Sequence, residues 1–570
     1  MKRKIIYSVL LTVMVFTFAG CSDFLDTKID TMTTPERVQT NRGTLWTAAN
    51  SMYTPIQYGF TILDNNLFAA VSDEAQQTDA IANVLYFNRG TINADVNPIS
   101  HLYRYYYEGI RAAYFFLDYA KDGENFLALN RDTSSVVSSN NWINYMRDVY
   151  TLNWYRAEAK VLMAYYYSEL IKMYGGVPII TYLMENDPEM GKVSKSTYDQ
   201  CVEHIVSLID EQVDKVNPNW NNAIVELGNW NIATNAGRID KATALAIKAR
   251  TLLYAASPRN NPNNDHTKWH RAAQAAHDLI VFKNYTMPQN RNYNAYFLQT
   301  GALGNAESIY FVRRNEMNTP EVRNYPISTP GGYSGITPTH NLVSSYEYIG
   351  TPNPDNPYDN RDPRLNATIV VNGSRWNNRE IDQSVGGSDD MAKANTSRTG
   401  YYLKKFLTDN LNLIQGATTQ HLWPLYRYAE VLLNYAEAMN EAYGPDDIPS
   451  GFTLSARQAL MQVRHSASTS LPAITTTNTN EFRQAIKHER RVEFAFEDHR
   501  YWDLIRWKDA ESVLNQPIKG VKVFKDLYGV YNYQVVDVAT RTFMLRNYYF
   551  PFMRSEVQNS KGTLIQNDGY

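Results

Sequence analysis

Two short motifs in the sequence combine residue types that could perform catalysis. His488-Glu489 begins like the zinc-binding pattern H-E-x-x-H, but Val492 stands where the second histidine is needed, so one helix face cannot offer two imidazoles to zinc. The stretch Gly332-Tyr333-Ser334-Gly335 is similar to a nucleophile elbow, yet its second glycine comes one residue early. Neither motif therefore predicts a catalytic centre.

Acidic residues could act as calcium ligands or as a catalytic pair. Asp355, Asp359 and Asp362 are closely spaced, but the surrounding prolines and the missing turn glycine favour rigid turns over a calcium loop. A glycosidase needs two carboxylates at a set separation in space rather than in sequence, so the 58 acidic residues leave a surface hydrolase open as an alternative. We predict no catalytic residue, no metal site and no cofactor.

The composition is that of a globular chain without a strong charge. The 570 residues include 55 Lys and Arg against 58 Asp and Glu, and a net charge of −3 does not attract phosphate backbones. The two cysteines, Cys21 and Cys201, cannot build a disulfide framework. Cys201 lies among apolar residues at helical spacing, which predicts a buried structural thiol. The 42 tyrosines suit packed helices and exposed binding surfaces equally.

The first twenty residues have the features of a secretory signal. Basic residues at 2–4 precede an apolar run over 5–18, which is too short to cross a hydrocarbon layer of about 30 Å as a helix. Phe18-Ala19-Gly20-Cys21 resembles the lipobox of bacterial lipoproteins, in which the cysteine is lipidated; a plain secreted protein is the alternative. We predict a signal peptide over 1–20, lipidation of Cys21 and a tether over 21–45.

Helical periodicity dominates beyond the tether. Apolar residues recur every three or four positions, with small residues where a partner helix must approach and aromatics beside them. This pattern is typical of tetratricopeptide-like helix pairs, although no strict period is present. We expect a mostly α fold in which about four such pairs form a scaffold. The periodic stretches cover 102–120, 157–171, 198–216, 243–257, 269–280, 425–439 and 482–496.

Two irregular regions interrupt the helical pattern. Residues 60–100 and about 286–420 are rich in Asn, Gly, Pro, Thr and Tyr, with short strand-like runs at 309–313 and 367–371. The second region is far longer than ordinary connections, and long loops commonly carry function. We therefore expect the ligand-facing surface in these two regions; a poorly ordered excursion is the alternative.

Five stretches of the chain, in order, resemble motifs of the SusD/RagB family of Bacteroidetes outer-membrane lipoproteins. They are the mature start CSDFLD, YGGVP at 174–178, RYAEVLL at 427–433, HERRVEFAFEDHRYWDLIRW at 488–507 and the closing QNDGY at 566–570. The fourth matches the family pattern ERR-E-E-R-DL-RW, with Asp498 where glycine is frequent. The last carries Asp where the family has Pro.

This resemblance implies one globular domain over 46–570. Its N-terminal region would cover about 46–285, the irregular ligand-facing insertion about 286–420 and the C-terminal region about 300–570. The resemblance also implies a non-enzymatic, lipid-anchored protein on the outside of the outer membrane. Such a protein captures glycan or another nutrient and passes it to a SusC-like TonB-dependent transporter. A helical scaffold that binds only protein is a further alternative.

Ligand capture requires an aromatic platform beside hydrogen-bonding groups, because a sugar ring has an apolar face and a hydroxyl rim. In the first irregular region we predict that Tyr86, Phe87, Asp79 and Arg89 take part. They combine two aromatic rings with two charged groups, although Tyr86 and Phe87 could equally belong to the core.

In the second irregular region the predicted ligand-binding residues are Tyr325, Tyr333, Arg375 and Trp376. Trp376 is the strongest candidate because Asn and Arg side chains flank it on both sides. We expect an exposed Trp376 ring, so that its replacement by alanine weakens binding with little loss of stability. Two further tyrosines of this region, Tyr346 and Tyr358, have similar polar neighbours, and we expect about half of these aromatic residues to pack internally.

The C-terminal block alternates the sign of its charges at helical spacing. Opposite charges three or four residues apart attract each other on a helix, and an indole gives arginine a flat surface to stack on. We predict that these residues form a structural charge network that fixes the last helix pair, and that they are not catalytic. They are Glu489, Arg490, Arg491, Glu493, Glu497, Arg500, Asp503, Arg506 and Trp507.

Overall fold

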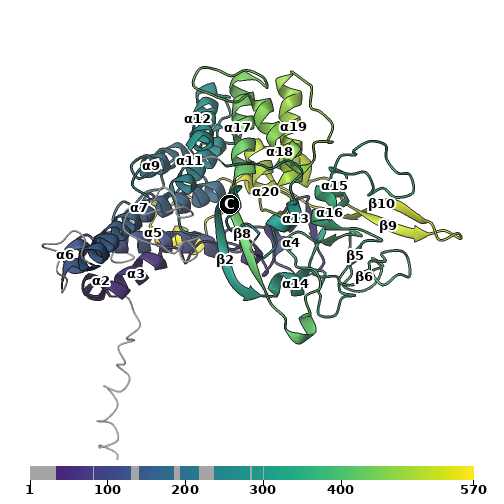
Figure 1. Cartoon of the computed structure of the whole chain (residues 1–570), viewed down its shortest axis with the longest axis horizontal. Helices are drawn as coiled ribbons and strands as arrows, with labels where there is room; N and C mark the ends of the chain where they lie inside the picture. Colours follow the sequence, from purple (N-terminus) through teal and green to yellow (C-terminus); the bar gives the residue numbers. More distant parts are fainter. Residues whose placement is uncertain are drawn as a thin grey trace, which may run out of the picture.

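The computed structural model describes residues 34–80, 82–129, 140–184, 193–216, 237–282, 285–299 and 301–570. The predicted signal peptide, Cys21 and the tether up to residue 33 lie outside the described residues. Figure 1 shows two parts: long helices at the left and top, and short strands with loops at the right.

Helical structure begins inside the predicted tether. α2 (Pro35–Thr40) and α3 (Arg42–Ser51) precede or overlap residue 45, where the tether was expected to end. Thr34 caps α2, with Pro35 in its first turn, and Asn41 caps α3 by accepting a hydrogen bond from the Thr44 amide at 3.0 Å. Part of the predicted tether is therefore a helix start. Because α3 buries Leu45, this segment belongs to the fold.

Eight helices of the described residues pack in chain order, each against the next. In Figure 1 they form a row from α5 and α7 at the left to α19 at the top. Eight helices taken two by two are four pairs, which confirms the predicted scaffold. Their bounds are α5 (His101–Tyr119), α7 (Asn140–Tyr174), α9 (Tyr198–Asp210), α11 (Lys241–Ala256), α12 (His266–Phe282), α17 (Tyr428–Tyr443), α18 (Ala456–Ala467) and α19 (Thr479–Glu493).

Small residues and end signals explain where these helices pack and stop. A Cβ atom on Gly109 of α5 would lie 2.4 Å from the ring of Tyr166 on α7, so only glycine permits this approach. α7 ends at Gly175, whose φ of 74° is in the left-handed region. α9 begins with a capping box between Thr197 and Gln200.

Short antiparallel strand pairs join the irregular regions to each other and to the helices. The longest pair also corrects one boundary, because residues 425–427, predicted as helix, belong to a strand that leads directly into α17. The pairs are β2 (Ser308–Met317) with β8 (Thr419–Arg427), β1 (Ala75–Gln77) with β3 (Ile336–Pro338), β4 (Ile369–Val370) with β7 (Tyr402–Leu403), and β5 (Arg375–Trp376) with β6 (Arg379–Glu380).

Short helices connect the longer elements, with α6 between α5 and α7 and the others in or beside the irregular regions. They are α4 (Val84–Asn88), α6 (Gly123–Ala128), α13 (Tyr293–Tyr296), α14 (Thr319–Asn324), α15 (His340–Val343) and α16 (Arg364–Thr368). The described part of the chain also has 3₁₀ turns at Gly59–Thr61, Phe68–Val71, Leu413–Gln415 and Leu545–Tyr548.

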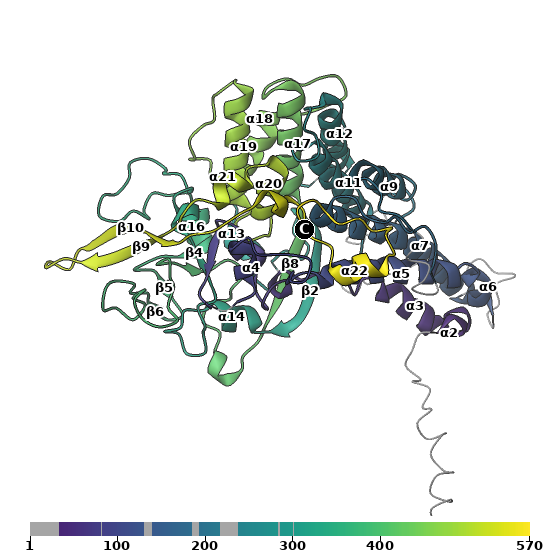
Figure 2. The ribbon, with the colours of Figure 1, turned by 180° about the vertical axis from the view of Figure 1, so that it is seen from behind.

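The chain after α19 returns across the molecule. α20 (Arg500–Trp507) and α21 (Ala510–Leu514) lead into a hairpin of β9 (Ile518–Lys525) and β10 (Tyr531–Ala539), which projects at the right of Figure 1. The last segment with α22 (Arg554–Asn559) crosses the opposite face, seen in Figure 2. Among the described residues, no helix has the length and apolar character needed to cross a membrane.

Candidate functional site

The two irregular regions meet where β1 pairs with β3. Just beyond β1, the Thr78 amide donates to the Gly335 carbonyl at 2.9 Å and the Thr78 hydroxyl donates to the Ser334 carbonyl at 2.5 Å. Asp79 follows directly and is exposed, as is Tyr333 on the other side. Asp79 and Tyr333 therefore lie on neighbouring loops, although the contacting residues Thr78 and Ser334 are 256 positions apart in the sequence.

The turn that carries Tyr333 holds its ring in solvent. The residue is 61% exposed. The Ser334 amide donates to the Tyr325 carbonyl at 2.8 Å, which closes the turn. A Cβ atom on Gly332 would lie 2.5 Å from the Pro326 carbonyl oxygen, so the turn needs glycine there. An aromatic ring fixed outward on an ordered turn offers a flat apolar face to a ligand.

The candidates on and next to α4 differ in their exposure to solvent. Tyr86 is 41% exposed and Arg89 is exposed, whereas Phe87 is buried. The Phe87 ring packs against Phe68 and Phe550, with centroid distances of 5.4 and 5.7 Å. Neighbouring residues on a helix point in different directions, so only one of the two aromatic rings can face solvent. Phe87 is a core residue, which corrects its predicted ligand-binding role.

Trp376, the strongest candidate from the sequence, is buried, with 3% exposure. It pairs with Arg379 across a tight turn at Asn377 and Asn378, whose φ angles of 52° and 59° are both positive. Side chains alternate along a strand, so Arg375 is exposed and Trp376 points inward. The asparagines around Trp376 form a hairpin turn and not the polar rim of an exposed ring, which corrects the prediction.

Tyr325 is also a core residue and not part of a platform. It has no exposed surface, and its ring meets Trp376 edge-on at a centroid distance of 6.2 Å. Its hydroxyl donates to the Thr408 carbonyl and accepts from the Leu411 amide at 3.3 Å, so its polar atom is satisfied internally. The predicted ligand-binding role of Tyr325 is corrected accordingly. Two further tyrosines considered from this region are buried as well: Tyr346 and Tyr358.

The exposed candidates are Asp79, Tyr86, Arg89, Tyr333 and Arg375, and we call them together the loop surface. The contacts of Thr78 place Asp79 and Tyr333 on neighbouring loops, whereas Tyr86 is exposed on α4 and Arg89 directly after it. The hairpin that carries Arg375 lies beside the segment before Tyr333, because Thr329 donates to Asn377 at 3.3 Å.

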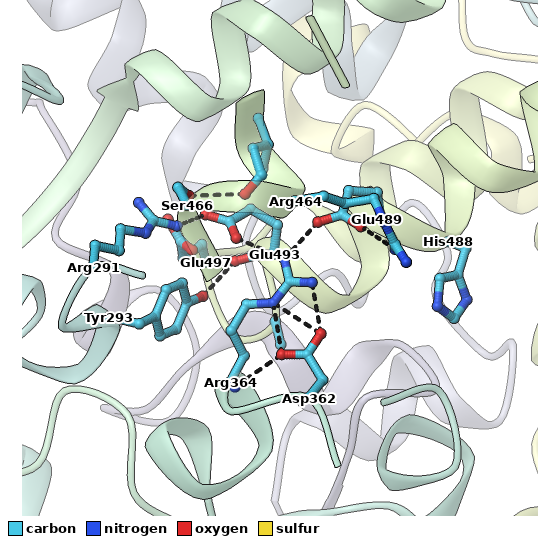
Figure 3. A network of polar contacts seen from close by, with 12 residues as sticks. Arg291, Tyr293, Asp362, Arg364, Arg464, Ser466, His488, Glu489, Glu493 and Glu497 are labelled. Carbon is cyan, nitrogen blue, oxygen red and sulfur yellow. Dashed lines mark hydrogen bonds and ion pairs between the residues drawn. The ribbon is translucent and has the colours of Figure 1, made fainter. Parts of the chain in front are cut away.

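The C-terminal block forms a buried charge network, and Figure 3 shows the part of it around Glu489, Glu493 and Glu497. Glu489 and Glu493 lie one turn apart on α19 and accept hydrogen bonds from the same Arg364 nitrogen at 2.6 and 2.8 Å. Arg427 donates to Glu493 at 2.7 Å and to Glu497 at 2.7 Å. These contacts join the insertion, the start of α17 and the end of α19.

A second part of the network joins α19, α20 and α17. Asp503 accepts from Arg490 at 2.9 and 3.0 Å and from Arg506 at 2.8 Å. Arg506 and the Trp507 indole nitrogen both donate to Glu437, each at 2.7 Å. The hallmark residues of α20 therefore lie between two helices of the scaffold.

The network also reaches the loop surface. Arg491 and Arg500 both contact the carboxylate of Asp73, at 2.7 and 2.8 Å. Arg541 adds a hydrogen bond to the Ala75 carbonyl at 2.6 Å. Since Asp73 and Ala75 lead into β1, buried charges fix the strand from which Asp79 emerges.

Neighbouring arginines keep two carboxylates of the network, Glu493 and Asp503, ionised. Burial alone would raise the pKa of Glu493, but the guanidinium groups of Arg291, Arg427 and Arg364 outweigh it and hold that pKa below its usual range. The pKa of Asp503 is lowered in the same way by its two arginines, against its burial. A carboxylate without a proton near neutral pH cannot act as a general acid. Glu493 and Asp503 can therefore fix structure, but they are unsuited to acid catalysis.

Sequence reasoning missed the partners of the hallmark residues, because they come from distant parts of the chain. Asp362, considered as a calcium ligand, instead accepts from Arg364 at 2.7 Å. The motif RYAEVLL did contain a signal for one partner, because its arginine, Arg427, donates hydrogen bonds to Glu493 and Glu497. The missed cations are Arg291, Arg364, Lys405, Arg427 and Arg464.

One acid of the block differs from its neighbours. Asp498 borders an internal cavity of about 90 Å³ between α5, α7, α11 and β8. Neither of its oxygens has a hydrogen-bond partner of ordinary geometry. Burial raises the pKa of Asp498 to about 7, although Lys172 and the nearby Phe68 amide lower it in part. Its φ of 61° lies in the region that favours glycine.

Replacing Asp498 by asparagine should stabilise the protein at about pH 8 by about 1–3 kcal/mol, because a buried charge without a partner is removed. The folded pKa of about 7 lies above the ordinary value of 3.8, so protonation favours the folded state and this contribution is lost as the pH rises through 7. The gain should therefore be small near pH 4 and complete above pH 7. Urea unfolding across this range measures it. A gain that does not change with pH, or an equal gain for exposed Asp355→Asn, would contradict the assignment.

Other reactive groups of the described residues do not form a site. No group of three or more His, Cys, Asp or Glu side chains in that part of the chain could hold a metal ion. Cys201 is buried on α9, and burial raises the pKa of its thiol to about 11. Its thiol is therefore protonated at neutral pH and a poor nucleophile.

The sequence of this chain matches known protein families and a known relative. A sequence model described as the SusD family matches residues 280–570, and another, described as starch-binding and associating with the outer membrane, matches residues 23–229. The SusD-like protein P38 of Formosa agariphila is 22% identical over 403 residues, which cover 67% of this chain and 72% of that protein.

Solved structures share the fold over almost the whole length. A SusD-like protein from Bacteroides fragilis superposes with a TM-score of 0.73 at 22% identity, covering 94% of this chain and 98% of its own. A SusD-like carbohydrate-binding protein from the same species gives 0.70 at 24% identity, covering 92% and 99%. The fold has the helix-pair scaffold and the buried charge network expected from the sequence. Because the family model also matches more than half of the chain, this chain belongs to the SusD/RagB family.

Proposed function

We propose that the protein is a lipid-anchored binding protein on the outer face of the outer membrane, which captures an oligosaccharide and passes it unaltered to a SusC-like TonB-dependent transporter. One observation carries this proposal: the Tyr333 ring, held 61% exposed on an ordered turn, in a chain that matches a starch-binding family description. The carbohydrate-binding relative from Bacteroides fragilis supports the same ligand class.

The loop surface supplies both elements that a sugar needs. Tyr333 and Tyr86 offer apolar ring faces, and Asp79, Arg89 and Arg375 offer hydrogen-bonding groups for hydroxyls. Buried charge pairs fix β1, and the closed turn fixes Tyr333, so part of this surface is preorganised. A preorganised surface loses little conformational entropy when it binds a ligand.

Capture without turnover agrees with the state of the acidic residues. Glu493 and Asp503 contact arginines that hold the pKa of each carboxyl below its usual range, so neither supplies the proton that a glycosidase acid must donate. The anchor rests on Cys21, because Phe18-Ala19-Gly20-Cys21 has the small residues before cysteine that lipid attachment requires. Several acyl chains on one cysteine give durable attachment.

Replacing Tyr333 by alanine should weaken oligosaccharide binding about 5–30-fold, equal to about 1–2 kcal/mol, because a stacking face is lost. The melting temperature should stay almost unchanged, since the ring is exposed. Calorimetric titration with oligosaccharides from starch, fructan, mucin and pectin identifies the ligand and measures the change.

The matched control is Tyr528→Ala, because Tyr528 is 91% exposed at the tip of the β9–β10 hairpin. The affinity of the Tyr528→Ala variant for the oligosaccharide should equal that of the unmodified protein. Equal losses in both variants, or no loss in the Tyr333 variant, would remove the loop surface as the binding site.

A further inference from the structure

The C-terminal segment crosses the scaffold on the face shown in Figure 2, and residues of this segment line a second hollow. It has a volume of about 800 Å³ and is formed by the segment before α9, the residues after α11 and α20, and the final turns of the chain. We call it the C-terminal cleft, and define it by its charged residues Lys195, Arg259, Lys508, Arg546 and Asp568.

The charges of the C-terminal cleft are unbalanced. Four cations face one carboxylate, although the whole chain has a net charge of −3. None of the four comes within 4.0 Å of a carboxylate oxygen among the described residues, in contrast to Arg427, which contacts three glutamates. The cleft is therefore a local positive region on a slightly acidic protein, and its field favours an anion.

Neutral groups position two of these cations without cancelling their charge. The Arg259 guanidinium donates to the carbonyls of Lys172 and Tyr548 at 3.2 and 3.1 Å, and its Nε atom is buried without a partner. Lys195 donates to the Asn567 side chain at 2.7 Å. Burial lowers the pKa of Lys195, only partly offset by Asp568, as expected for a desolvated ammonium group whose charge is not fully balanced.

The size and the rim of the cleft argue for more than an inorganic ion. A volume of about 800 Å³ lies within the usual range for organic ligands of about 300–1,000 Å³. Leu545 and Ile565 on the rim are 66% and 69% exposed, and Tyr548 and Tyr549 line the interior. Apolar and aromatic surface beside fixed cations matches a ring-shaped ligand that carries an acid group.

We propose that the C-terminal cleft binds an anionic sugar residue, one that bears a carboxylate or a sulfate, at a site separate from the loop surface. The preference for an anion follows from the charges of the cleft alone. The choice of a sugar rests in addition on the proposed function of the protein. The guanidinium and ammonium groups bind the acid group, and the apolar rim packs against the sugar ring.

The test uses the full mature protein and calorimetric titration with trigalacturonate, a sulfated disaccharide and a neutral maltotriose. Both anionic probes should bind, less tightly at about 300 mM than at about 50 mM salt. Lys508→Gln should weaken their binding at least about fivefold, because an exposed cation of the cleft is lost, with no change in melting temperature. The control is Lys519→Gln, because Lys519 is an exposed lysine on β9 outside the cleft. This variant should bind the anionic probes with unchanged affinity.

Three results would overturn the proposal: no binding of either anionic probe, equal effects of the two lysine variants, or equal affinity for an oligoglutamate peptide of similar charge. The Tyr333→Ala variant keeps the two proposals distinguishable. If it loses neutral oligosaccharides but retains trigalacturonate, the two sites are separate. If neutral sugars never bind while trigalacturonate does, the cleft stands and the loop surface fails.

Discussion

Replacing Glu493 by glutamine should lower the free energy of unfolding by about 3–5 kcal/mol, because one neutral amide would then face several buried guanidinium groups. Glu493 has no exposed surface and contacts Arg291, Arg364 and Arg427. Removing one partner of a buried ion pair leaves the remaining charges unpaired in a medium of low dielectric constant. Urea unfolding at neutral pH measures the loss.

The control for this substitution lies on the same helix. Glu481 in the first turn of α19 is exposed, and its replacement by glutamine should change stability by less than about 0.5 kcal/mol. If Glu493→Gln also changes stability by so little, the hallmark network does not hold the fold together. If that variant does not fold at all while Glu481→Gln folds normally, the network is essential rather than only stabilising.

Replacing Trp376 by alanine should cost about 3–5 kcal/mol of stability, because a buried indole leaves a cavity. The ring packs against Tyr325 and lies beneath the Lys404 ammonium group, 5.6 Å from it. This expectation reverses the one from the sequence, which placed Trp376 in solvent. Thermal unfolding of Trp376→Ala and of its exposed neighbour Arg375→Ala separates the two views. An unchanged melting temperature with weaker sugar binding would restore the exposed platform.

The long helices were predictable because their apolar residues repeat with the helical period. The stretch 243–257 corresponds to α11 (Lys241–Ala256), and 269–280 lies within α12 (His266–Phe282). Local signals, such as the glycine pair after Tyr174, also set the ends. These features depend on neighbours in sequence, so one sequence contains enough information to place them.

The β9–β10 hairpin was not predicted. Alternating apolar residues such as Val521 and Val523 are present, but half of the second strand faces solvent. The alternation of apolar and polar residues in β10 is therefore weak. This strand is defined by its pairing with β9 rather than by burial.

The candidate site was predicted only in part, for a physical reason that Trp376 illustrates. A polar residue beside an aromatic ring can belong to a binding rim or to a turn, and composition does not separate the two. Asn377 and Asn378 adopt positive φ, so they serve the turn. Tyr333 has similar neighbours but faces outward, because its turn is closed by Ser334 and Gly332.

If the protein binds an oligosaccharide and leaves it intact, the ligand should survive prolonged incubation, which mass spectrometry of the recovered ligand measures. The oligosaccharide identified by titration is mixed with excess protein and then separated from it. We expect saturable binding and recovery of a ligand of unchanged mass. Shorter fragments, formed by the unmodified protein and absent after replacement of a single acidic residue, would contradict it.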